Sequence, residues 1–149
     1  MKRITLCIGL LVITITPDKT LTKSTPKELV PLLNIATLRK AIKKSSLKNK
    51  AIVFKQAIGE TGWLKSKICL QNHNLFAMRF HKGLPIAKAN GYAVYRNWLE
   101  SLKDYEIWQR LNYKNPKENY YSFLERIGYA EDTSYTKFLT SINISKSWY

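Results

Sequence analysis

The sequence predicts one mainly helical α+β domain with a small β-hairpin lobe. Three observations predict this fold class. Apolar side chains recur at helical spacing through most of the chain after residue 32. Short alternating runs flank the dipeptide Asn90-Gly91, which is a strong hairpin signal. A length of 149 residues with 45% hydrophobic content suits one domain with a sizeable core and argues against disorder.

The first 20 residues have the features of an export signal. Lys2 and Arg3 precede an uncharged apolar run at residues 4–15. The run is shorter than the roughly 20 residues of a membrane-spanning helix, and an uncleaved signal anchor is the alternative. Residues 21–32 are expected to form a tether and a short first helix, and residues 33–145 the functional domain. We therefore expect an exported protein of the periplasm or cell envelope, or a secreted one.

Helical periodicity predicts five segments within this domain, at residues 33–44, 51–58, 97–109, 119–127 and 132–142. Their ends carry the usual signals. Asn97 and Glu100 have the spacing of a capping box, Gly128 stands where a helix commonly stops, and Asp132 is expected to cap the last segment.

A lone carboxylate, Glu60, ends the apolar helix at residues 51–58. Gln56 shares its helical face, and Gly59 and Gly62 reduce the bulk around it, which would allow a ligand to approach closely. Trp63 offers a broad apolar surface, and a carboxyl held against such a surface loses hydration. Its pKa rises, so that it stays protonated near neutral pH as a general acid requires. On spacing alone, a surface Glu beside a helix-ending Gly is the commoner arrangement.

Four blocks of the sequence match one pattern in the same order. They are Gln-Ala-Ile-Gly-Glu-Thr-Gly-Trp at 56–63, Asn-Leu-Phe at 74–76, the run at 95–105, and Gly-Tyr-Ala-Glu-Asp at 128–132 with Tyr135. In these blocks the chain resembles the glucosaminidase family of peptidoglycan hydrolases, glycoside hydrolase family 73, over roughly residues 35–142. The resemblance implies a lysozyme-like domain in which Glu60 is the catalytic acid and Tyr129 lines the sugar site.

The resemblance also implies a substrate, the glycan strands of peptidoglycan, cleaved at the β-1,4 bond after N-acetylglucosamine by a monomer without a cofactor. Residues expected to contact this substrate lie around Glu60. They are Gln56, Trp63, Asn74, Phe76 and, on the hairpin that forms one wall of the groove, Tyr92. Asn74 is also expected to fix its loop, with Phe76 packed in the core.

The second catalytic group has three interpretations. Glycosidases that use two carboxylates hold them about 5 to 9.5 Å apart, yet residues 61–99 contain no Asp or Glu. We favour a substrate-assisted route, in which the sugar's acetamido group attacks and Tyr129 steadies the developing positive charge. A later acid, Asp104 or Asp132, is the second interpretation, and a module that binds glycan without cutting it is the third. A muramidase or lytic transglycosylase of the same fold is a further alternative.

The net charge of +15 predicts an anionic partner. Basic residues mixed with aromatic ones would suit single-stranded nucleic acid, but export argues against it and favours an anionic cell-wall or envelope surface. Cys69 is expected to be a small buried apolar residue, because nothing completes a catalytic set with it and His73. His73 and His81 lack the company of a metal site, so none is expected.

Overall fold

The computed structural model describes residues 29–132 and 134–144, and in this part of the chain it confirms the predicted α+β, mainly helical fold. The elements are α1 Ile35–Lys44, α2 Lys50–Glu60, α3 Lys67–Asn72, β1 Ala87–Ala89, β2 Tyr92–Val94, α4 Trp98–Asn112, α5 Tyr120–Arg126 and α6 Tyr135–Ser141. The predicted export signal lies outside the described residues. None of the described helices has both the length and the apolar character that a membrane-spanning helix needs.

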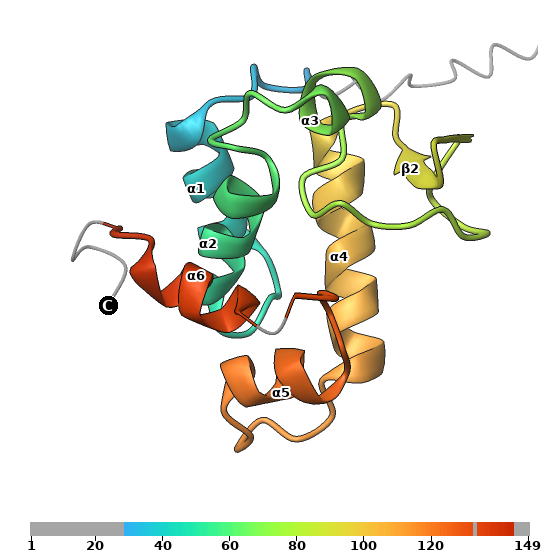
Figure 1. The fold of residues 1–149 in the computed structure, drawn as a ribbon. Coiled ribbons are helices and arrows are strands. Elements are labelled where there is room, and N and C mark those ends of the chain that lie inside the picture. Colours follow the sequence, from blue (N-terminus) through green and yellow to red (C-terminus); the bar gives the residue numbers. More distant parts are fainter. Residues whose placement is uncertain (1–28, 133, 145–149) are drawn as a thin grey trace, which may run out of the picture.

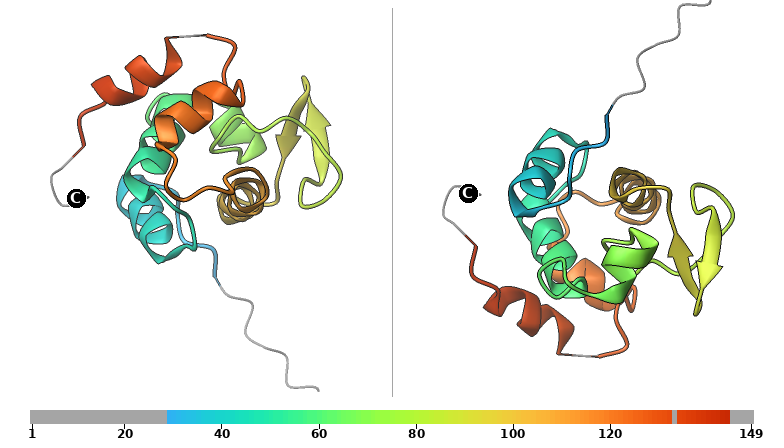
Figure 2. Two further views of the ribbon diagram at one scale, coloured as in Figure 1. Left: turned by 90° about the horizontal axis from the view of Figure 1, so that it is seen from below. Right: turned by 90° about the horizontal axis from the view of Figure 1, so that it is seen from above.

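The helices surround a core between α2 and the long helix α4. In Figure 1, α1 and α2 stand opposite α4, α6 packs beside α2, and α5 lies near the end of α4. Both views of Figure 2 place α4 between the α1–α2 pair and the β-hairpin. The hairpin therefore forms a separate small lobe at one edge of the helical body, as the sequence predicts.

Helix α2 is the most enclosed element. Every residue from 53 to 58 is buried, including the polar side chains Lys55 and Gln56. The sequence pattern predicts one apolar face, but α1 and α6 contact this helix as well and cover its other sides. Lys55 is accommodated because its Nζ donates to the Thr140 carbonyl of α6 at 3.4 Å. The helix that ends in Glu60 is therefore fixed by packing on several sides.

The two-stranded sheet pairs Ala87 with Val94 and Ala89 with Tyr92 across the Asn90-Gly91 turn. Both turn residues have positive φ, 49° and 84°, which is what a tight hairpin turn requires. Asn74 ties this lobe to the helical body. It is fully buried, and its Nδ2 donates to the carbonyls of Met78 and Ala93 at 2.9 and 3.0 Å. The prediction that Asn74 fixes its loop is confirmed.

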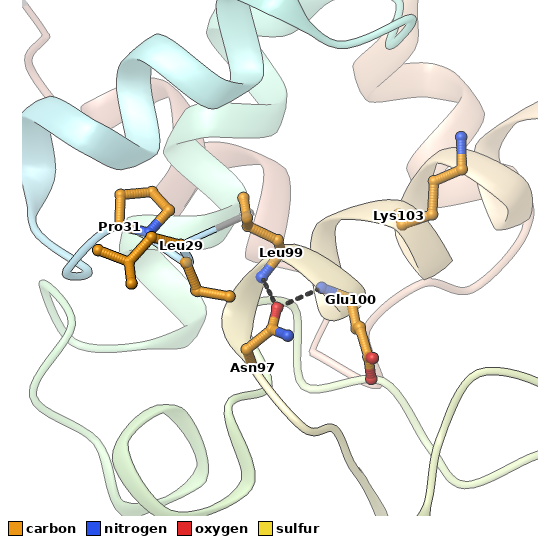
Figure 3. Close-up of a pocket in the computed structure, with 7 residues that line it drawn as sticks. Leu29, Pro31, Asn97, Leu99, Glu100 and Lys103 are labelled. Atoms are coloured by element: carbon orange, nitrogen blue, oxygen red, sulfur yellow. Dashed lines mark hydrogen bonds between the residues drawn. The ribbon is translucent and has the colours of Figure 1, made fainter. Parts of the chain in front are cut away.

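The start of α4 holds the first described residues of the chain. Trp98 Nε1 donates to the Pro31 carbonyl at 2.8 Å. Residues 29–33 are not helical, so the short first helix that the sequence predicts is absent from this described part of the segment. Figure 3 shows the Asn97 amide oxygen accepting hydrogen bonds from the N–H groups of Leu99 and Glu100, beside a cavity on this face. Glu100 Oε2 accepts from the N–H of Arg96 rather than of Asn97, so only half of the predicted capping box forms.

Two further helix assignments differ from the sequence prediction. Helix α3 was not predicted, because a six-residue helix spans too few turns to show a period. Ser134, not Asp132, is the N-cap of α6, while Asp132 Oδ1 accepts from the Ser134 N–H at 2.7 Å in the preceding turn. Cys69 is buried, as predicted.

Candidate active site

Glu60 is the last residue of α2, and three hydrogen bonds hold the turn after it. The Trp63 N–H donates to the Ile58 carbonyl at 2.8 Å and the Gly62 N–H to the Gly59 carbonyl at 3.2 Å, which is the Schellman arrangement with Gly62 at φ 52°. The buried Thr61 hydroxyl donates to the Ala57 carbonyl at 2.6 Å. These bonds fix the backbone at the helix end from which the Glu60 side chain projects.

The Glu60 carboxyl is partly buried and accepts a hydrogen bond from Tyr135 of α6. The Tyr135 hydroxyl donates to Glu60 Oε1 at 2.7 Å, and Gln56 Nε2 lies 3.5 Å from the same hydroxyl. Desolvation by burial raises the pKa of Glu60, while the Tyr135 hydrogen bond acts in the opposite direction and is the weaker effect. The raised pKa suits a general acid.

Behind Gln56, a row of buried polar side chains leads across the core to the loop between α1 and α2. Tyr105 Oη lies 2.7 Å from Gln56 Oε1 and 2.9 Å from Tyr120 Oη. Gln109 Nε2 lies 2.9 Å from Tyr120 Oη, and the Gln109 amide also bonds both backbone groups of Lys48. These residues come from α2, α4 and α5, so the environment of Glu60 is assembled from most of the domain.

Tyr129 lies beside this row. Its ring stacks on Tyr135 with centroids 5.6 Å apart and meets Trp108 edge-on at 5.3 Å. Its hydroxyl donates to the Phe76 carbonyl at 3.0 Å, which leaves the hydroxyl oxygen free to act as an acceptor. Burial raises the pKa of Tyr129, so it stays neutral. The structure thus brings Tyr129 to Glu60 through Tyr135, as neighbours within one aromatic cluster.

The residues predicted to contact substrate fall into two groups. Gln56, Asn74 and Phe76 are 0%, 0% and 1% exposed, so in this structure other residues separate them from any ligand and they act as supports. Trp63 is 52% exposed and Tyr92 is half-buried under the Arg79 guanidinium, 4.5 Å from its ring centroid. Only Trp63 and Tyr92 of this set have surface to offer a glycan.

The two alternative acids have different surroundings. Asp104 is buried, and its Oδ2 accepts from the Tyr95 hydroxyl at 2.6 Å and bonds His81 Nε2 at 2.7 Å. Asp132 is exposed, and a hydrogen bond from the Ser134 N–H lowers its pKa. Asp132 also lines a cavity of about 280 Å³ together with Tyr135. Of the two, Asp132 is therefore the one that shares a surface with a residue bonded to Glu60.

The sequence does not predict two contacts that the structure shows at and beside Glu60. Tyr135 belongs to the same sequence block as Tyr129, but nothing in the sequence indicates that its hydroxyl reaches Glu60. Gly59 was expected to let a ligand approach, but the group that approaches it is Phe138 of α6. A side-chain carbon at Gly59 would lie 2.9 Å from Phe138 Cε1. Gly59 therefore lets α6 pack close enough to bring Tyr135 to the carboxyl.

Comparison with protein families gives one match. A family model described as Glucosaminidase, mannosyl-glycoprotein endo-beta-N-acetylglucosaminidase, matches residues 36–145, which include Glu60, Tyr129 and Tyr135. Searches of curated proteins and of solved structures gave no match. The match covers most of the chain and agrees with the mainly helical fold with its small hairpin lobe. The protein belongs to the glucosaminidase family of glycoside hydrolases, whose members act on peptidoglycan glycan.

Proposed function

We propose that the protein is an exported endo-β-N-acetylglucosaminidase that cleaves the β-1,4 bond after N-acetylglucosamine in peptidoglycan, with Glu60 as the general acid. The observation that supports this most is the Glu60 carboxyl itself. It stands at a rigid helix end within the family match, and burial raises its pKa. A carboxyl that is still protonated near neutral pH can protonate a glycosidic oxygen.

In the proposed reaction the Glu60 proton moves to the oxygen that links the two sugars, and the bond from this oxygen to C1 of N-acetylglucosamine breaks. The acetamido carbonyl oxygen of the same sugar forms a new bond to C1 and closes a charged five-membered ring. Water then attacks C1 as the ionised Glu60 takes a proton from it, which reopens the ring and restores the acid. The electron-rich oxygen and ring of Tyr129 would face the positive charge that develops on the sugar or its acetamido group.

Substrate assistance is favoured because the alternative acids are engaged elsewhere. Two donors already occupy the same oxygen of the buried Asp104, and freeing it for catalysis would leave a buried carboxylate with fewer partners. Asp132 is exposed and bonds its own turn. Its shared cavity with Tyr135 makes it the stronger of the two rival candidates.

The location and the partner surface are part of the same proposal. A signal at residues 1–20 would take the protein to the cell envelope, where its charge of +15 favours adsorption to anionic wall or membrane surfaces. Basic side chains gather on one face of α1, where Arg39, Lys40, Lys43 and Lys44 line a shallow cavity with Ile35.

Digestion of purified peptidoglycan followed by mass spectrometry of the fragments tests the proposed bond. New reducing ends of N-acetylglucosamine are expected, whereas N-acetylmuramic acid ends would indicate a muramidase and anhydro ends a lytic transglycosylase. Glu60→Gln is expected to fold and to lose hydrolysis by at least about a hundredfold. Retained activity in this variant would remove Glu60 from the mechanism.

The second catalytic group is tested separately with a thiazoline mimic of the cyclised intermediate. Under substrate assistance it should bind far more tightly than N-acetylglucosamine, and de-acetylated glycan should resist cleavage. If thiazoline binds no better than the sugar and Asp132→Asn or Asp104→Asn abolishes turnover, a protein carboxylate is the second group instead.

A further inference from the structure

We infer that Tyr135 is a positioning residue that keeps Oε1 of Glu60 as a hydrogen-bond acceptor, so that the transferable proton of Glu60 is carried on Oε2. The inference rests on the proposed role of Glu60 as the general acid. It follows from a series of hydrogen bonds in which each side chain donates to the next one toward Glu60, and the direction of this series is set at its far end by the backbone of Lys48.

The direction begins at Gln109 of α4. The Lys48 N–H donates to Gln109 Oε1 at 2.8 Å, and Gln109 Nε2 donates to the Lys48 carbonyl at 3.0 Å. A backbone N–H can only donate and a backbone carbonyl can only accept, so the Gln109 amide has a single orientation. The remaining N–H of Gln109 then donates to Tyr120 Oη, 2.9 Å away.

The tyrosines carry the direction through the core. Among the described residues, the Tyr120 hydroxyl contacts Gln109 Nε2 and Tyr105 Oη. Because Gln109 is the donor in the first contact, the proton of Tyr120 goes to Tyr105 at 2.9 Å. The proton of Tyr105 in turn goes to Gln56 Oε1 at 2.7 Å, which fixes the amide of Gln56 with its nitrogen toward Tyr135.

The series ends on the carboxyl. Gln56 Nε2 faces the Tyr135 hydroxyl at 3.5 Å, the longest link, so the proton of Tyr135 goes to Glu60 Oε1 at 2.7 Å. A proton on Oε1 would point at that O–H group, which leaves Oε2 to carry it. When Glu60 gives up this proton, the Tyr135 bond becomes charge-assisted and stronger. An interaction that strengthens along the reaction lowers the barrier rather than only the ground state.

The titratable groups that bear on Glu60 are Tyr135 of α6 and Tyr129 of the preceding loop. Burial and the nearby Glu60 carboxylate raise the pKa of both tyrosines, so neither ionises in the range where Glu60 does. A titration observed at the Glu60 carboxyl therefore belongs to Glu60, and a change in its midpoint reports the hydrogen bond.

The test is a carbon-13 NMR titration of the Glu60 carboxyl in the full chain, with the signal assigned by its loss in Glu60→Gln. Tyr135→Phe keeps the ring but removes the donor, so the midpoint should move to higher pH. Tyr113→Phe is the matched control, because Tyr113 is also buried but its hydroxyl is not part of this series of hydrogen bonds. It donates to the Glu118 carbonyl at 2.5 Å. This control should leave the midpoint unchanged. A folded Tyr135→Phe protein with the wild-type midpoint overturns the inference.

Kinetics give a readout that a merely structural role would not move. In Tyr135→Phe, loss of one hydrogen bond to the developing carboxylate should lower kcat roughly tenfold with KM unchanged. The alkaline limb of the pH profile should move to higher pH. If the wild-type protein cleaves no glycan, the proposed function fails, whereas the NMR titration still decides whether Tyr135 donates to Glu60.

A second variant tests the series without changing either end residue. Gln56→Met removes the link between Tyr105 and Tyr135, which weakens Tyr135 as a donor, so the Glu60 midpoint should move in the same direction by less. In the double variant with Tyr135→Phe the midpoint should equal that of Tyr135→Phe alone. Additive shifts would show that the two residues act on Glu60 separately and would overturn the series.

Discussion

Removal of the Asn74 side chain is expected to be among the most destabilising polar changes in this domain. Besides its two bonds to carbonyls, Asn74 Oδ1 accepts from the N–H groups of Met78 at 3.0 Å and Phe76 at 3.3 Å. Asn74→Ala breaks all four bonds inside the core. At about 1 kcal/mol net for each, the expected loss is about 4 kcal/mol, a large part of the 5–15 kcal/mol that stabilises a typical domain.

Urea unfolding followed by circular dichroism measures this loss. With a slope near 1.5 kcal/mol per M, the midpoint for Asn74→Ala should fall by about 2 to 3 M. Asn112→Ala is the matched control, because Asn112 is exposed and makes one bond, from Nδ2 to the Trp108 carbonyl at 2.7 Å. Its effect should stay within about 0.5 kcal/mol. A loss below about 1 kcal/mol for Asn74→Ala would refute the view that this side chain joins the hairpin lobe to the helical body.

Three further changes test the packing and charge around the site. Phe76 is 1% exposed and its ring stacks on Tyr105 with centroids 4.0 Å apart, so Phe76→Ala should lower the free energy of unfolding by about 3–5 kcal/mol in the same assay. Phe80→Ala is the control, because the Phe80 side chain is 41% exposed, and it should cost less than about 1 kcal/mol. Tyr129→Phe should lower kcat roughly tenfold at constant KM, whereas a rise in KM alone would make Tyr129 a binding residue. Desolvation lowers the pKa of His81, but the hydrogen bond to the Lys82 carbonyl and the nearby Asp104 have the larger combined effect, so the pKa is raised. The His81–Asp104 pair therefore stabilises the fold fully below about pH 6.5, and this stability is lost as the pH rises through the raised pKa. Melting curves at pH 5.5 and 8.5 should show that His81→Ala removes this dependence.

Local signals in the sequence predict the elements well. The apolar period marks α1, α2, α4 and α5, and Asn90-Gly91 marks the hairpin, because these features depend on residues close together in the chain. Glu60 could be placed at the end of its helix for the same reason. Local signals do not predict which segments far apart in the sequence come into contact.

The candidate site depends on such meetings. Tyr135 bonds Glu60 across a separation of 75 residues, and His81 bonds Asp104 across 23. Neither contact leaves a periodic trace, since a tyrosine on the apolar face of a short helix has the same pattern whether it fills space or donates a hydrogen bond. Both partners of the His81 ring, the Lys82 carbonyl and Asp104, are acceptors, and this arrangement favours the ring with both nitrogens protonated. Only the structure shows this pairing.

The environment of Glu60 balances two effects that a general acid needs in opposition. A fully desolvated carboxyl would hold its proton too firmly to transfer it, and a carboxyl in water would already be ionised at neutral pH. Here burial raises the pKa of Glu60, and the Tyr135 hydroxyl offsets part of that rise while also stabilising the anion left after transfer. Burial thus favours the protonated form from which a general acid starts, and the Tyr135 hydrogen bond favours the anion that proton transfer leaves. Because Gly59 lets α6 approach α2, and because Lys48, Gln109 and the tyrosines fix the direction of the final hydrogen bond, this balance is a property of the whole helical body rather than of Glu60 alone.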